Sequence, residues 1–171
     1  MRTSGDFIIY YILLTVAQLI FCNYLNMSQF VVFSLLPALV FCLPMQVRTF
    51  PAMLIAFVTA LAVDWLGDGL IGLNALALVP VALLRNPLVA GIFGRDVVER
   101  KGSFSIYKNG LFSCTGAVVI VTSVFMLVYI IADGAGTRPF WFMLVRFICS
   151  VAASSVLGLI TLNVLNPRER R

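Results

Sequence analysis

The chain has 171 residues, of which 61% are hydrophobic and only 11% are charged, and its mean hydropathy is +1.05. Soluble domains are about half apolar and about a quarter charged, so the composition excludes a soluble globular protein and indicates an integral membrane protein. Histidine is absent, which removes the usual metal ligand and general base, so we expect no enzyme, metal or cofactor.

The first 47 residues predict two membrane helices. No charged residue occurs between residues 7 and 47, a length about twice that of one span. The polar stretch at residues 23–29 divides this region, so we expect helices over residues 7–22 and 30–43, with a kink at Pro37. No cleavage site follows the first helix, so we expect it to remain as an anchor rather than act as a signal peptide.

The next two apolar arms, residues 49–63 and 70–84, flank an acidic and glycine-rich stretch. We expect short helices over residues 49–66 and 70–84 that form a hairpin. Arms of fifteen residues are short for full spans, so three arrangements stay open: crossing a thinned bilayer, extending into the acidic stretch, or forming a re-entrant pair.

The second half of the chain predicts two more helices. A basic connection at residues 85–110 precedes an uninterrupted apolar run at residues 111–132, and Pro139 opens a last helix over residues 139–164. The sequence therefore predicts an all-α polytopic membrane protein with six transmembrane helices in a single domain, residues 1–171.

Ten of the twelve basic residues fall on one side of this six-helix arrangement, together with both termini. The positive-inside rule then predicts that both termini and the basic connection are cytoplasmic. The amphipathic residues 97–101 within that connection suit contact with anionic lipid, or docking of a cytoplasmic protein. The basic residues flank membrane helices, so we expect membrane lipid and no nucleic acid as their partner.

The hairpin tip carries most of the candidate site residues, and this orientation places it at the outer face. Asp64 and Asp68 stand four residues apart, so they share one face of a helix and are candidates for a cation or proton site. Gly69 and Gly72 allow a tight turn, and Gly72 and Ala75 are small enough for a second helix to come close. Asn74 is expected to make a hydrogen bond between helices.

Arg146 lies about seven residues into the last helix, roughly 10 Å from its outer end. At this depth in the membrane an unpaired guanidinium is costly. Either it extends to the interface, or it pairs internally with Asp64, Asp68 or Asp133. The four cysteines lie inside apolar runs without a Cys-x-x-Cys pair, so we assign them to packing.

The hairpin resembles the bacterial rod shape-determining protein MreD family. The resemblance lies in Leu43 and Pro44 before the third helix, in Asp64, and in the run Gly-Leu-Asn-Ala-Leu-Ala-Leu at residues 72–78. Asp68 stands where the family is expected to have glycine, and Asn74 where it often has histidine.

This resemblance implies a non-enzymatic membrane scaffold of the cell-elongation machinery, in the inner membrane of a bacterium. Such a subunit works with the bitopic protein MreC, the MreB filament, and the glycosyltransferase and transpeptidase that build lateral peptidoglycan. The fold is also similar to that of the substrate-binding subunits of energy-coupling-factor transporters, so the alternative is a small-molecule-binding transporter component.

Overall fold

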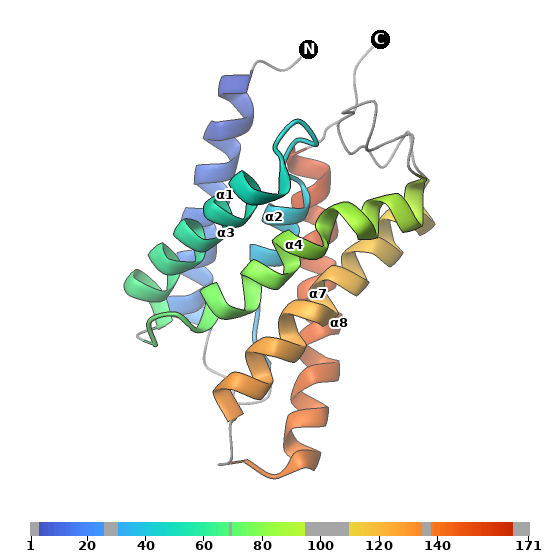
Figure 1. The fold of residues 1–171 in the computed structure, drawn as a ribbon. Helices are drawn as coiled ribbons and strands as arrows, with labels where there is room; N and C mark the ends of the chain where they lie inside the picture. Colours follow the sequence, from blue (N-terminus) through green and yellow to red (C-terminus); the bar gives the residue numbers. More distant parts are fainter. Residues whose placement is uncertain (1–3, 26–30, 69, 95–109, 135–137, 166–171) are drawn as a thin grey trace.

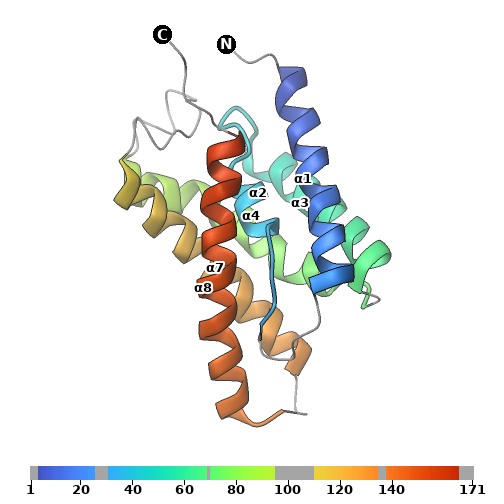
Figure 2. The same ribbon diagram turned by 180° about the vertical axis from the view of Figure 1, so that it is seen from behind.

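The computed structural model describes residues 4–25, 31–68, 70–94, 110–134 and 138–165. All secondary structure in these ranges is helical: α1 (Ser4–Leu25), α2 (Leu36–Phe41), α3 (Thr49–Val63), the π-helical turn η1 (Asp64–Asp68), α4 (Leu73–Phe93), α7 (Leu111–Gly134) and α8 (Phe140–Leu165). Figures 1 and 2 show these helices as one bundle, with α1 and α8 upright and α3, α4 and α7 oblique to them.

Four of the described helical stretches are long and apolar enough to cross a membrane: Thr49–Gly67, Leu73–Phe93, Phe112–Gly134 and Phe140–Leu165. A shorter apolar stretch, Phe7–Asn23, lies in α1. The protein is therefore a membrane-embedded helical protein. The first arm extends into the acidic stretch, one of the arrangements left open, because η1 continues α3. The second arm is longer than expected, because α4 runs on to Phe93.

The helix expected over residues 30–43 is wrong. Residues 31–35 are not helical, and α2 has only six residues, about 9 Å of helix, which cannot span a bilayer. Pro37 occupies the first turn of α2, where its missing N–H is harmless, so it opens the helix instead of kinking a longer one. The chain still runs back along α1 through this extended stretch and α2 (Figure 2).

Side chains of α1 and α8 hold the extended stretch by its backbone. In α8, the Ser150 and Ser154 hydroxyls accept the N–H groups of Val32 and Ser34, at 2.9 and 3.0 Å, and the Ser154 hydroxyl also donates to the Val32 carbonyl. Gln18 of α1 accepts the Leu35 N–H at 2.6 Å and donates to the Phe33 carbonyl at 3.3 Å. Non-helical backbone inside a membrane protein needs such partners, because no water reaches it.

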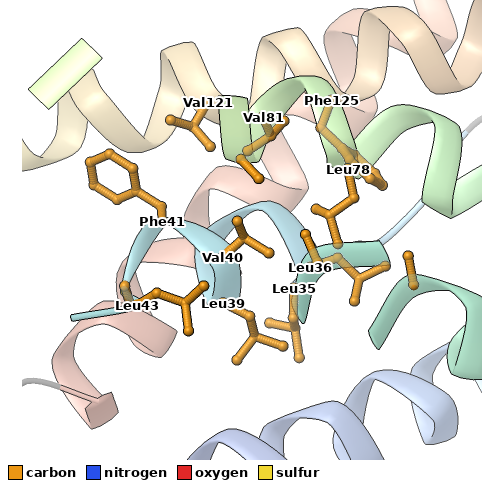
Figure 3. Close-up of a cluster of buried hydrophobic side chains, with 14 of the residues drawn as sticks. Leu35, Leu36, Leu39, Val40, Phe41, Leu43, Leu78, Val81, Val121 and Phe125 are labelled. Carbon is orange, nitrogen blue, oxygen red and sulfur yellow. The ribbon is translucent and has the colours of Figure 1, made fainter. Parts of the chain in front are cut away.

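The short helix α2 lies at the centre of the bundle. All six of its residues are buried, and it contacts α1, α3, α4, α7 and α8. Figure 3 shows Val40 of α2 on the side of α4 and α7, near Leu78, Val121 and Phe125, and Leu39 on the opposite side of α2. The core of the protein is therefore built around the element that the sequence predicted as a transmembrane helix.

Small and polar residues make up much of the buried faces of the long helices. Ala52, Ala56 and Ala60 are fully buried along one face of α3, which packs on α4. In α8, a Cβ added to Gly158 would come within 2.7 Å of Val118 in α7, so only glycine allows this approach. Close backbone approach at small residues is the main way in which membrane helices gain packing energy.

Large apolar side chains instead point outward. They lie on the outer faces of α1, α3, α7 and α8, as at Ile9, Phe57, Leu127 and Ile148. A water-soluble protein would bury these residues, but a bilayer solvates them. The outward-facing apolar side chains thus agree with the membrane protein that the composition indicates.

Removing the hydroxyl of Ser154 should destabilise the bundle. Ser154→Ala leaves the Ser34 N–H and the Val32 carbonyl without this partner, at a cost of about 1–3 kcal/mol for an unsatisfied buried group. We expect a lower unfolding temperature of the purified protein in detergent. The matched control is Ser123→Ala, because the Ser123 hydroxyl bonds only to the Val119 carbonyl of its own helix turn and should matter little.

Candidate functional site

The Asp64 carboxylate closes the hairpin by binding the start of α4. It accepts the Asn74 backbone N–H at 3.1 Å and the Asn74 side-chain amide at 2.7 Å on Oδ1, and the Gly72 N–H at 2.9 Å and the Ala75 N–H at 3.4 Å on Oδ2. The Asp64 side chain is fully buried. Both carboxylate oxygens are therefore occupied by donors of the same chain.

These contacts make Asp64 a helix cap supplied from a distant position. Gly72, the residue before α4, has no side chain with which to accept the N–H groups of the first turn, and Asp64 accepts them from eight to eleven residues away. A negative charge is also favourable at this end of a helix, because the backbone dipoles place partial positive charge there. The interaction stabilises a buried carboxylate and a helix start together.

Gly72 is needed for its backbone conformation. Its φ is +98°, which L side chains rarely adopt, whereas a Cβ added there would meet nothing within 4 Å. No described helix of this chain therefore comes close to the position that a Cβ of Gly72 would occupy. Ala75, in contrast, is buried in the core.

The remaining residues of the expected tip are only partly described. Asp68 ends η1, but its side chain lies outside the described part, as does Gly69. Asn74 makes the expected hydrogen bond between segments, because its amide reaches Asp64 in η1. The structure thus brings together Asp64, Gly72, Asn74 and Ala75. The expected cation or proton site at Asp64 and Asp68 lies in part outside the described residues.

Arg146 pairs with Asp133, and not with Asp64. Its Nη1 contacts the Asp133 Oδ2, which joins the end of α7 to the first turns of α8. Arg146 is 8% exposed, so it lies inside the bundle and does not extend freely to the interface. Of the partners that the sequence left open, Asp133 is the one that the structure selects.

Arg85 is a buried cation that sequence reasoning missed. We expected it to begin the basic connection, but α4 continues past it and leaves it only 1% exposed. Its Nε donates to the Phe41 carbonyl at 3.3 Å, and its Nη2 donates to the Leu43 carbonyl, so it binds carbonyls at the end of α2. Cations suit a helix C-terminus, where carbonyl groups lack helical partners.

The spacing of Arg85 carried a signal that we did not use. It follows Leu78 by seven residues and Val81 by four, which puts it on the apolar stripe of α4 that faces the core.

Within the described ranges, no group of three or more cysteine, aspartate, glutamate or histidine side chains is placed to hold a metal ion.

Comparison with known proteins adds no relative: no family model, curated protein or solved structure matches the chain significantly.

Loss of the Asp64 cap should unfold the hairpin at a lower temperature. Asp64→Ala leaves at least three donors near the start of α4 without this acceptor, and we expect a loss of about 2 kcal/mol or more, read as a fall in the unfolding temperature in detergent.

Gly72→Ala should also destabilise the protein, because alanine at positive φ is strained by about 1 kcal/mol or more. Gly116→Ala is the control, since its added methyl also meets nothing within 4 Å, without the positive φ.

The ion pair predicts which substitutions are coupled. Arg146→Ala and Asp133→Ala should each lower the stability, and the double variant should lose much less than the sum, because each single change removes the same interaction. Arg146→Ala and Asp64→Ala should add, because Asp64 has other partners. Coupling between Arg146 and Asp64 in this cycle would contradict the assignment.

Proposed function

We propose that the protein is a non-enzymatic membrane scaffold of the bacterial cell-elongation machinery, of the MreD type. The proposal starts from the resemblance of residues 72–78 and of Asp64 to that family. Asp64, Gly72, Asn74 and Ala75 among them form the cap of α4, so part of the resemblance falls on one structural unit.

The observation that carries the scaffold role is the use of the buried acids. Asp64 has both oxygens occupied by donors of its own chain, and Asp133 is paired with Arg146. A cation site or proton relay needs a carboxylate with a free oxygen or an open path to water. Carboxylates that are paired within the chain instead favour a protein that works through its shape.

The partners and the location follow from the same proposal. The scaffold binds MreC in the membrane and, through it, joins the MreB filament and the peptidoglycan glycosyltransferase and transpeptidase. It lies in the cytoplasmic membrane of a bacterium as a multi-pass protein with both termini inside. The distribution of the basic residues supports this orientation.

The transporter alternative requires a polar, closed pocket of ligand size. One groove on the outer face of α1 has a volume of about 390 Å³ and is lined by Ile9, Ile12, Leu13 and Val16. An open apolar groove suits lipid or a partner helix better than a polar nutrient. This groove therefore gives the transporter alternative no support.

The test is complementation in the native host after depletion of the chain. The wild-type chain should restore rod shape and co-purify with MreC, and Asp68→Asn should keep both. Ala75→Leu adds bulk to a buried position beside the cap, so at equal protein level we expect rounded cells and weaker recovery of MreC. Ala152→Leu is the control, because Ala152 is exposed on α8.

Two outcomes would overturn the proposal. One is the absence of MreC from material that restores shape. The other is loss of rod shape in Asp68→Asn with MreC still bound, which would indicate an ion or ligand role.

A further inference from the structure

The tip of the hairpin is covered with large apolar side chains. Trp65 and Leu66 in η1 are 78% and 64% exposed, and Leu70 and Ile71 in the following turn are 59% and 72% exposed. We refer to these four residues as the apolar tip. In water they would form a contiguous apolar surface, and burying one such side chain contributes about 1.5–3 kcal/mol.

The apolar tip also lies at a different depth from the other hairpin of the protein. In Figures 1 and 2, η1 and the start of α4 lie part-way along α8, whereas the end of α7 and the start of α8 lie well beyond them. α8 has 26 residues, so at 1.5 Å per residue it is about 39 Å long, more than the bilayer core of about 30 Å. The obliquely placed α3 and α4 cover less of this depth.

From these observations we propose that the apolar tip is inserted among the acyl chains of the bilayer, so that the α3–α4 hairpin ends inside the membrane and not in water. This inference is independent of the proposed function, because it concerns the contact of the tip with lipid alone.

Lipid is the occupant that the surroundings of the tip favour. The apolar tip continues the outward face of α3, where Phe57 and Val58 are 45% and 63% exposed. That face lies on a helix long and apolar enough to cross the membrane, so lipid already covers the surface next to the tip.

Several backbone groups at the end of the hairpin have partners within the protein. Asp64 accepts the Gly72 N–H, and the Leu70 carbonyl accepts the Leu73 N–H at 3.4 Å. The Gly72 carbonyl accepts the Leu76 N–H at 2.9 Å. Irregular backbone is tolerated at membrane depth when the protein satisfies its polar groups, and here the buried Asp64 supplies the missing acceptor.

The proposed depth is the part of the acyl region next to the headgroups. Tryptophan prefers this zone, because its ring is largely apolar and its N–H remains within reach of polar groups.

The two tryptophans of the chain, Trp65 and Trp141, make the test direct. Trp141 lies at the start of α8 and is 73% exposed, so it reports the depth of the other hairpin. Trp141→Phe leaves Trp65 as the only fluorophore, and Trp65→Phe leaves Trp141. Both variants change exposed side chains, so little packing is lost.

Each variant is purified without partners and placed in phosphatidylcholine vesicles, with or without bromine on the acyl chains. We expect brominated lipid to remove most of the Trp65 emission, and aqueous iodide to have little effect on it. Trp141 should be quenched less by the brominated lipid and more by iodide. Equal depths for the two residues, or strong quenching of Trp65 by iodide, would overturn the proposal.

A second measurement does not depend on fluorescence. A membrane-impermeant maleimide should label Arg138→Cys in vesicles, because Arg138 is exposed before α8, but should label Ile71→Cys only after detergent is added. The parent chain gives the background from its four cysteines. Labelling of Ile71→Cys in intact vesicles would place the tip in water, and would leave the apolar tip to a protein partner.

Discussion

Inside a bilayer, every backbone N–H and carbonyl must find its partner within the protein, and this constraint governs the bundle. It is met where regular helices end. Asp64 accepts the N–H groups at the start of α4, Arg85 donates to carbonyls at the end of α2, and the serines of α8 together with Gln18 hold the extended stretch before α2. Polar residues that would be expensive alone in a membrane are therefore the means by which a broken helix is tolerated at its centre.

This use of polar residues bears on function. The intramembrane charges Asp64, Arg85, Asp133 and Arg146 all contact groups of the same chain. Intramembrane charges often mark transport paths, but here their contacts tie one segment to the next. Such a molecule is suited to present a fixed shape to other membrane proteins, and an apolar tip anchored in lipid would fix the position of the hairpin relative to them.

Arg85 and Arg146 do not use all of their donors. Among the described residues, the Arg85 Nη1 and the Arg146 Nε are buried without a hydrogen-bond partner. Each guanidinium has five N–H donors in a fixed fork, so a site that offers only two carbonyls or one carboxylate leaves some of them unpaired. A cation held by few acceptors inside a bundle ties the surrounding helices to one arrangement, because any displacement would cost further hydrogen bonds.

The properties that depend on composition and local pattern could be predicted from the amino-acid sequence. The apolar runs predicted a helical membrane protein, and the charge-free lengths located the α3–α4 hairpin and the long helices α7 and α8. The position of Asp64 before the glycine-rich turn indicated the hairpin as the candidate site. It did not reveal that the Asp64 carboxylate caps α4. The orientation in the membrane, the family and its partners remain predictions.

The features that rest on contacts between distant segments could be seen only in the folded protein. Residues 31–35 have the apolar composition of a helix, but Gln18, Ser150 and Ser154 supply their backbone with partners from 15 to more than 100 residues away, which makes an extended chain stable there. Hydropathy cannot detect this, because it scores each residue without its neighbours in space. For the same reason it counted Arg85 as the start of a loop, whereas the carbonyls at the end of α2, brought close by folding, hold it inside.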